Sequence, residues 1–418
     1  MSDNQIKQNK FLYGAMKLAA NTVSRVKFKR EFLRNEIKDK KGPFVVIANH
    51  AAALDFVNLI GATSEPMHFV ISSSFYQTIP VRGVMPRLGL IPKQQFQTTL
   101  NDLRTMKRVI DGGNILVIYP AGLMSDDGTP TPMPAATCKF LKFLGTDVYV
   151  AKNIGTYFSM PKWRKGGIRA GKTFLDIYKL FDGGELAAKE LDEIKTAMEA
   201  ALDFDAYAEQ ESLHIKYKNG HNIEGLENVL YTCPNCGGEF TVKTRNESEI
   251  WCEACGYCER ADEYQFLHKV SDVGEEIRYP SEWRKRTRSA LAERVKTGEV
   301  CELSAKVEIK TITTGKSKFQ TAGEGVITLD ADNFRIAGVV NGEKMDVSIP
   351  TASFASLPYK PGAYIEIQNG DEIYRCLPED GREVIRFIDL LWVFHTIHNA
   401  ALEEEHRRYE EQQTKTEK

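Results

Sequence analysis

Two closely spaced pairs of cysteines constrain this chain of 418 residues more than any other feature. Cys233 and Cys236 form the first Cys-x-x-Cys pair, Cys252 and Cys255 form the second, and fifteen residues separate the two pairs. A glycine follows each pair, which suits a tight turn whose backbone amides support two thiolates. Two such turns supply the four sulfurs of a tetrahedral zinc site. We therefore expect these four cysteines to bind one Zn²⁺ ion.

A site of four thiolates implies a structural zinc, because it leaves no coordination position for a reacting water. The spacing is typical of a zinc ribbon, which we place at residues 226–265, with a β-rich arm between the pairs. Cys258 is a further sulfur close by, so the identity of the fourth ligand stays open. The clustering of cysteines indicates metal binding in a reducing compartment and not a framework of disulfides.

Nucleic acid is not an expected partner of this chain. The formal net charge is −2, and the arm of the ribbon carries five glutamates beside Lys243 and Arg245. Binding to phosphates would require a basic surface. A ribbon that stabilises its own chain or contacts another protein is the better interpretation.

The regions on either side of the ribbon differ in pattern, which predicts several domains. Apolar runs alternate with helical periodicity before the ribbon, which favours a layered α/β domain, whereas short β-rich segments and one long helix follow it. We predict a basic amphipathic helix at 1–30, an α/β domain at 31–225, the ribbon at 226–265, a helical linker at 266–298, a β-rich domain with a C-terminal helix at 299–406 and a charged tail at 407–418.

The stretch from Pro43 to Asp55 carries the most distinctive chemistry. Phe44 to Ala48 is a short apolar run that predicts a buried strand; Asn49 and His50 follow it, and Asp55 comes five residues after the histidine. A histidine at the end of a strand is held above a rigid sheet, and a nearby carboxylate fixes its tautomer. Because no serine or cysteine stands beside the pair, the simplest chemistry is a histidine base that acts on a substrate hydroxyl.

Asn49-His50-x-x-x-x-Asp55 after an apolar strand resembles the signature of the glycerolipid acyltransferases, the family that includes the lysophosphatidate acyltransferases. The resemblance extends over about residues 20–205 and implies an α/β domain with a mixed sheet. It implies that His50 is the general base and that Asp55 orients it. It also implies a fatty acyl donor, acyl-CoA or acyl carrier protein, and a lysophospholipid-like acceptor.

The second motif of that family is matched only in part. Gly89-Leu90-Ile91-Pro92 corresponds to its glycine-led turn, but the phosphate-binding arginine that usually follows is absent. Lys93 stands nearby, and Arg82 or Arg87 can substitute as the cation. Lysine lacks the forked geometry with which arginine holds a phosphate. We assign Lys93 as the expected phosphate contact and keep the two arginines as alternatives.

The third motif keeps Tyr119, Pro120, Gly122 and Ser125 after the strand from Ile115. Two positions depart from the family: Ala121 replaces a glutamate, and Met124 replaces a common arginine. By resemblance, the expected substrate-binding residues are Asn49, Lys93, Pro120, Gly122 and Ser125. The departures leave the acceptor open. They also support an alternative from another class, a non-catalytic scaffold that binds membrane lipid through a degenerate acyltransferase domain.

Two basic segments of the first domain each allow two interpretations. Residues 4–30 carry basic and apolar side chains and no acid, so a helix there lies on an anionic membrane or packs on its own domain. The segment around Trp163 either exposes that ring among basic residues to head groups or an acidic carrier protein, or forms a surface loop with Trp163 half buried. We also expect one amphipathic helix from Glu185 to Leu202 to close the domain.

The region after the ribbon predicts six or seven antiparallel strands and one helix from Arg382 to His406, an architecture that resembles a pleckstrin-homology-like domain. The chain contains no run of eighteen apolar residues and no signal-like N-terminus. We therefore expect a cytoplasmic protein bound peripherally to the inner face of the cell membrane.

Overall fold

The computed structural model describes residues 8–80, 82–95, 98–312, 317–354, 356–370 and 372–416, the last sixteen of these by their backbone alone. The chain forms two compact units. One holds Met1–Leu226, Lys243–Ser281 and Thr314–Lys318, and the other holds Glu227–Val242, Glu282–Thr313 and Phe319–Lys418.

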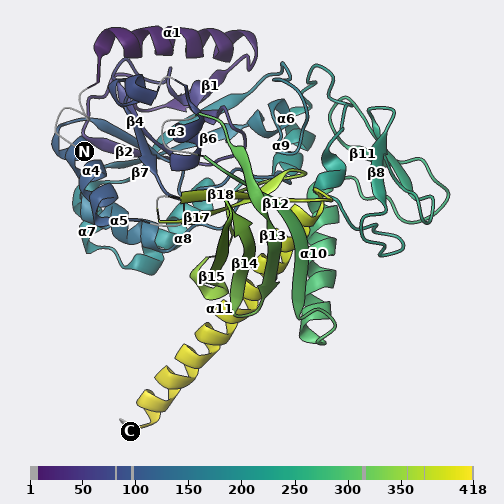
Figure 1. Ribbon diagram of the computed structural model, residues 1–418. Helices are drawn as coiled ribbons and strands as arrows, with labels where there is room; N and C mark the ends of the chain where they lie inside the picture. The colour runs from purple at the N-terminus through teal and green to yellow at the C-terminus, as the bar shows by residue number, and fades with distance from the viewer. Residues whose placement is uncertain are drawn as a thin grey trace. The chain divides into compact units, whose positions relative to one another are not determined.

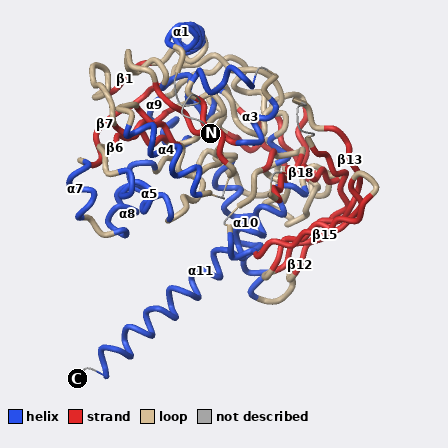
Figure 2. The backbone as a smooth tube through the Cα atoms, turned by 60° about the vertical axis from the view of Figure 1, so that its left-hand side comes forward, coloured by secondary structure: helices blue, strands red, loops and turns tan. Residues whose placement is uncertain are grey.

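The first unit is built on a seven-stranded sheet with the strand order β1-β7-β6-β2-β5-β3-β4 (Figures 1 and 2). All neighbouring strands are parallel except β6 and β7, so the sheet is mixed, as predicted. The strands are β1 (Glu31–Asn35), β2 (Phe44–Ala48), β3 (Met67–Ser72), β4 (Leu90–Lys93), β5 (Ile115–Ile118), β6 (Val148–Ile154) and β7 (Phe174–Phe181).

Helices cover both faces of this sheet, and β2 is buried along its whole length. Phe44, Val46 and Ala48 face one core, which also contains side chains of α1 and α2. Val45 and Ile47 face a second core with α4, α5 and α8. A strand buried on both faces has a continuous run of apolar residues, which is why the sequence predicted β2. The helices of this unit are α1 (Lys10–Val26), α2 (Asp55–Leu59), α3 (Ser73–Thr78), η2 (Arg82–Leu88), α4 (Leu100–Asp111), α5 (Ala136–Leu144), α6 (Thr156–Ser159), α7 (Gly183–Ala188), α8 (Leu191–Leu202) and α9 (Ala206–Leu213).

The single helix expected from Glu185 to Leu202 was wrong. The chain forms two helices, α7 and α8, with an extended residue, Glu190, between them. The side chain of Glu190 caps α8, and the side chain of Glu193 bonds back to the backbone of Glu190. A reciprocal cap of this kind satisfies amides that begin a helix, so it favours a new start over continuation.

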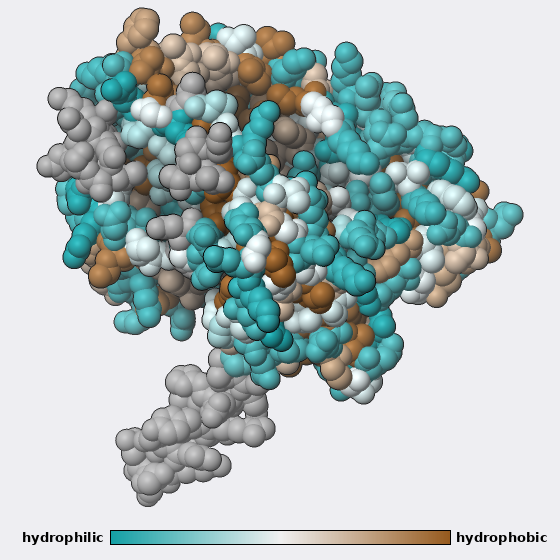
Figure 3. Space-filling model, viewed as in Figure 1, coloured by the Kyte–Doolittle hydropathy of each residue, from teal (hydrophilic) through white to brown (hydrophobic). Residues whose placement is uncertain are grey.

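The N-terminal helix α1 packs on its own domain through one face. The Tyr13 hydroxyl accepts a hydrogen bond from the Met67 amide at 3.0 Å, and the buried Ser24 hydroxyl donates to the Asn58 side chain at 2.9 Å. The opposite face exposes apolar side chains, with Phe11 83% and Leu18 71% exposed. Brown apolar surface lies over this helix in Figure 3.

A small antiparallel sheet follows, with the order β11-β10-β9-β8. Its strands are β8 (Val242–Arg245), β9 (Glu249–Cys252), β10 (Cys258–Ala261) and β11 (Leu267–Lys269), and the short turn η3 (Leu226–Asn228) precedes them. The β-rich arm expected between the cysteine pairs contains β8 and most of β9.

The second unit holds a seven-stranded antiparallel sheet with the order β15-β14-β13-β12-β18-β17-β16, and one final helix, as predicted. That helix, α11, continues past the expected end at His406. None of the helices in the described residues is long and apolar enough to span a membrane. The elements here are α10 (Pro280–Lys296), β12 (Glu302–Thr311), β13 (Gln320–Asp330), β14 (Asn333–Val340), β15 (Glu343–Pro350), η4 (Thr351–Ser353), β16 (Tyr359–Lys360), β17 (Tyr364–Asn369), β18 (Glu372–Pro378) and α11 (Glu383–Thr416).

Candidate active site

His50 and Asp55 lie together just beyond the carboxyl end of β2. The imidazole Nδ1 of His50 is 3.1 Å from Oδ2 of Asp55, which also accepts a hydrogen bond from the Ala52 amide at 2.9 Å. Asp55 is fully buried at the start of α2, whereas the His50 side chain keeps 21% of its surface exposed. A carboxylate accepts hydrogen bonds, so Asp55 holds the proton of His50 on Nδ1 and leaves Nε2 with its lone pair. The pair therefore has the form of an oriented base.

Asn49 fixes the strand end from which His50 projects. Its side-chain oxygen accepts from the Asn153 amide at 2.7 Å, and its side-chain nitrogen donates to the Asn153 carbonyl at 2.9 Å. Both ends of the Asn49 amide are therefore engaged with β6. This geometry favours a positioning role over the predicted contact with substrate.

Tyr119 forms a wall of the site, although it was not among the site residues predicted from the motifs. Its ring centroid lies 4.5 Å from that of His50, with the two planes tilted by 34°. Its buried hydroxyl has no hydrogen-bond partner among the described residues. Burial, with a smaller effect from the negative charge of Asp55, raises the pKa of Tyr119 well above its ordinary value. The ring thus confines the imidazole from the side of β5.

The loop that follows β5 is tied to the histidine by its backbone. The Ser125 amide donates to the His50 carbonyl at 2.9 Å, and the buried Ser125 hydroxyl donates to the Thr129 carbonyl at 2.6 Å. Gly122 adopts a φ of +68°, and its amide donates to the Tyr119 carbonyl at 2.9 Å. Only glycine takes a positive φ without steric cost, so Gly122 closes a tight turn that begins at Tyr119. Ser125 and Gly122 therefore fix the conformation of this loop.

Lys93 ends β4, two strands from β5 across β3. Its ammonium donates to the Gln94 carbonyl at 3.0 Å, and burial lowers the pKa of the Lys93 amine. The neighbouring Gln95 side chain donates to the Gly122 carbonyl and so connects this edge of the sheet with the loop after β5. Lys93 is thus at the same edge as His50 but not beside it.

Trp163 lies in the interior, so the interpretation that exposes its ring was wrong. The segment does reach the surface at residues 165–167, as the alternative expected, but Trp163 is buried more deeply than half. Trp163 is 3% exposed, and its indole donates to the Tyr157 hydroxyl at 3.1 Å. Arg169 is also buried, where its guanidinium donates to the Gln265 side chain and the Asn222 carbonyl. Burial lowers the pKa of Arg169 to about 9. These groups hold the domain together and offer no surface for a head group.

Cys233, Cys236, Cys252 and Cys255 converge, with their sulfurs within 4.8 Å of one another. Zinc–sulfur bonds of about 2.3 Å in a tetrahedron place sulfurs about 3.8 Å apart, so this set fits a zinc ion. Both turns have the same form: the amides of Gly237 and Gly256 donate to the carbonyls of the first cysteine of each pair, at 2.9 and 3.0 Å. These four thiols can therefore hold a metal ion.

Cys258 stands outside that cluster of sulfurs. It is buried on β10, where its sulfur lies 3.8 Å from the Arg245 guanidinium. Burial raises the pKa of the Cys258 thiol. The ambiguity over the fourth ligand is thus resolved in favour of Cys255.

Comparisons with known proteins point to the same domain. A family model described as Acyltransferase matches residues 25–151, which include His50, Asp55 and the loop after β5. A similar solved structure is the 1-acyl-sn-glycerophosphate (LPA) acyltransferase PlsC of Thermotoga maritima, with 20% identity and a TM-score of 0.37 over 46% of this chain and 78% of that chain. No curated protein matches the sequence.

Proposed function

We propose that this protein, whose residues 25–151 form a domain of the acyltransferase family, transfers a fatty acyl group from a thioester donor to a hydroxyl of a lysophospholipid-like acceptor. The family match confirms the resemblance drawn from the motifs. The donor is acyl-CoA or acyl carrier protein. The observation that carries the proposal is the pairing of the part-exposed His50 with the buried Asp55 at 3.1 Å.

In this mechanism His50 is the general base. Its Nε2 takes the proton of the acceptor hydroxyl as the oxygen attacks the thioester carbonyl, and Asp55 stabilises the resulting imidazolium. The tetrahedral intermediate then collapses, the carbon–sulfur bond breaks, and the imidazolium returns the proton to the departing thiolate. The products are an ester and a free thiol, and no covalent enzyme intermediate is needed.

The loop after β5 is the proposed source of donors for the oxyanion or for an acceptor phosphate. The amide of Gly122 itself is engaged with the Tyr119 carbonyl, so it is not the donor first expected. The amides of Leu123 and Met124 follow this turn and precede the Ser125 amide that is bonded to the His50 carbonyl, so they are the better candidates. Backbone amides held in this way stabilise developing negative charge without reorganisation.

Membrane association is supported by α1. Its outer face carries exposed Phe11 and Leu18, and the exposed basic residues Lys10, Arg25 and Lys29 lie on or next to the helix. Apolar side chains beside cations suit the interface of an anionic bilayer, where a lysolipid acceptor would reside. We therefore propose a peripheral position on the cytoplasmic face of the cell membrane.

Zinc at the four cysteines is proposed as a structural ion. A full shell of thiolates supplies folding free energy and no reactive water. Metal analysis of the purified protein should find about one zinc per chain, and a Cys252→Ser variant should lose it. Retention of the full zinc content by that variant would contradict this ligand set.

A second candidate, the non-catalytic lipid-binding scaffold, is favoured by Ala121. The family places a carboxylate at this position, and here a methyl group stands beside the catalytic loop. Such a protein would bind vesicles and transfer no acyl group. The retained His50–Asp55 geometry favours the enzyme.

The deciding experiment measures acyl transfer by purified protein from labelled acyl-CoA and acyl carrier protein to a panel of lysolipids and other alcohols. We expect the His50→Ala variant to lose about 10³-fold in rate, within the usual contribution of a general base. His221→Ala is the matched control, since that side chain is 44% exposed and remote in sequence from the site motifs. Undiminished turnover in His50→Ala would refute the role of His50, and vesicle binding without turnover on any acceptor would favour the scaffold.

A further inference from the structure

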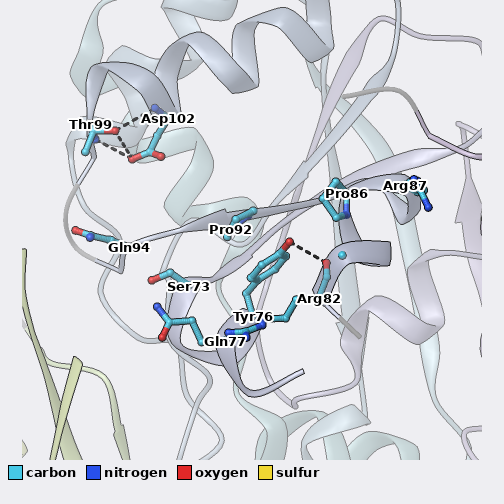
Figure 4. Close-up of a pocket in the computed structure, with 11 residues that line it drawn as sticks. Ser73, Tyr76, Gln77, Arg82, Pro86, Arg87, Pro92, Gln94, Thr99 and Asp102 are labelled. Atoms are coloured by element: carbon cyan, nitrogen blue, oxygen red, sulfur yellow. Dashed lines mark hydrogen bonds between the residues drawn. The ribbon is translucent and has the colours of Figure 1, made fainter. Parts of the chain in front are cut away.

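A recess lies at the same edge of the sheet as His50, at the far side of β5. Its volume is about 740 Å³, and it is lined from α3, η2, the end of β4 and the start of α4 (Figure 4). Ligand sites of enzymes commonly have volumes of this size. The mechanism proposed above gives this recess no role.

The lining of the recess combines polar side chains with Gly83, Pro86 and Pro92. It includes Ser73, Tyr76, Gln77 and Gln94, whose side chains can donate or accept hydrogen bonds. Such a lining suits a ligand with amide or hydroxyl groups.

The charges of the lining favour an anion. Arg82 and Arg87 contribute two guanidinium groups against one carboxylate, that of Asp102. Asp102 is already engaged by the cap of α4, where it accepts from the Thr99 amide at 2.9 Å and the Thr99 hydroxyl at 2.8 Å. Arginine binds phosphate through two parallel hydrogen bonds, so a phosphate is the natural anion here.

Arg82 is the better placed of the two arginines. It is partly buried, and Figure 4 shows its side chain beside Tyr76 and Gln77. The Tyr76 hydroxyl donates to the Arg82 carbonyl at 3.1 Å, which holds the backbone of this residue at the rim. Arg87 is exposed and lies at the other end of the recess, beyond Pro86.

The distance from His50 to the recess restricts the ligand further. The strands β2, β5, β3 and β4 are adjacent and parallel, and their registers place His50, Ser73 and Gln94 at the same level of the sheet edge. Strands lie about 4.8 Å apart, so Ser73 and Gln94 are roughly 10 and 14 Å from the position of His50. The phosphate of a small glycerolipid acceptor lies only a few bonds from its reacting hydroxyl and would not reach.

The thioester donor carries a phosphate at the required distance. Coenzyme A and acyl carrier protein both present the acyl group on a phosphopantetheine arm, which contains two amide bonds and ends in a phosphate. Its backbone from sulfur to phosphorus is about as long as four extended residues, or about 14 Å. A thioester beside His50 would therefore bring an amide of the arm to the level of Ser73 and its phosphate to the level of Gln94, inside the recess.

We propose that this recess holds the phosphopantetheine arm of the acyl donor, with the Ser73 side chain facing one of its amides and Arg82 binding its phosphate. The assignment rests on the proposed acyl transfer, because it identifies the ligand as the donor of that reaction. It assigns a donor subsite to residues of α3 and η2 at the end of β4, next to the second motif of the resemblance.

The test is a calorimetric titration of the full-length protein with phosphopantetheine and with pantetheine, which differ only in the phosphate. We expect the wild-type protein to bind phosphopantetheine about tenfold more tightly, the usual order for a charge-assisted contact. Arg82→Gln should abolish this preference and leave the affinity for pantetheine unchanged, whereas Arg82→Lys should keep part of it. Arg104→Gln, which removes an exposed guanidinium from α4 outside the recess, is the control and should behave as wild type.

Other results would overturn the proposal. They are equal affinity of the wild-type protein for the two ligands, no binding of either, or an intact preference in a folded Arg82→Gln variant. A parallel titration with sn-glycerol 3-phosphate separates the two sources of phosphate: if Arg82→Gln weakens that ligand instead, the recess serves the acceptor. Since binding needs no turnover, a protein that prefers phosphopantetheine through Arg82 but transfers no acyl group would refute the proposed function and leave this subsite standing.

Discussion

Asp55 and Asp389 are both fully buried, but their partners differ. In the first unit, Asp55 pairs with His50 at 3.1 Å, and the histidine keeps 21% of its side chain exposed. In the second unit, Asp389 on α11 accepts hydrogen bonds from Arg284 and Arg288 on α10, both at 2.7 Å. Arg284 has no exposed surface at all.

The difference between these pairs lies in the partner and not in the carboxylate. Imidazole has two nitrogens, so an aspartate can occupy one and leave the other available to a substrate. A guanidinium has only donors and keeps its proton at any ordinary pH. A buried aspartate therefore indicates chemistry only where its partner is a part-exposed group that can exchange a proton; otherwise it fastens one element to another.

The largest effect that we predict is on stability, at Asp389. The Asp389→Ala variant should lower the free energy of unfolding by about 3–5 kcal/mol, because it leaves a fully buried arginine without its counter-charge. Denaturant unfolding followed by fluorescence measures this loss. The control is Asp346→Ala, which breaks the exposed pair with Arg335 on the neighbouring strands and should change stability little. If both variants lost the same free energy of unfolding, the burial of Asp389 would not explain its contribution to stability.

The next largest effect is on the rate of acyl transfer, at Asp55. In Asp55→Asn the amide oxygen can take the position of Oδ2, where it accepts hydrogen bonds from both the Ala52 amide and Nδ1 of His50. The neutral amide lacks the negative charge that stabilises the imidazolium formed when His50 takes the substrate proton. We expect acyl transfer to fall about 100-fold, equivalent to about 2.7 kcal/mol of activation free energy, with little change in stability. If Asp55→Asn unfolded easily but kept its rate of acyl transfer per folded molecule, Asp55 would have a structural role like that of Asp389.

The parts of the fold that were predictable from sequence are those fixed by local patterns. The apolar run of β2 predicted its burial, and the cysteine spacing predicted which four sulfurs converge. Each of these depends on residues close together in the chain. Local physical chemistry was sufficient for them.

Features that depend on distant partners were not predictable in this way. Arg169 lies among basic residues in the sequence, but its guanidinium donates hydrogen bonds to Asn222 and Gln265, which are 53 and 96 residues away along the chain. Trp163 is buried in the same interior. A basic, aromatic segment has the same composition whether it faces solvent or a core, so only tertiary packing decides between them.

The smallest predicted effect is at Tyr119. Variants of this residue measure how much the side chain packed against the His50–Asp55 pair contributes to the rate. The ring lies 4.5 Å from the imidazole, while the hydroxyl is buried without a partner among the described residues. Tyr119→Phe keeps the ring and removes an unpaired polar group, so it should keep the rate within a few fold and leave the protein as stable or slightly more stable. Tyr119→Leu removes the wall and should lower kcat about tenfold, near 1.4 kcal/mol, with KM nearly unchanged.

The split between kcat and KM distinguishes positioning of the base from substrate binding at Tyr119. If Tyr119→Leu raised KM and left kcat intact, the ring would contact substrate and would not act through His50. If Tyr119→Phe were as slow as Tyr119→Leu, the rate would depend on the Tyr119 hydroxyl and not on the ring. The hydroxyl would then act through the carboxylate of Asp55. Only the first pattern, with the phenylalanine variant active and the leucine variant slow in kcat, supports confinement of the imidazole by the ring.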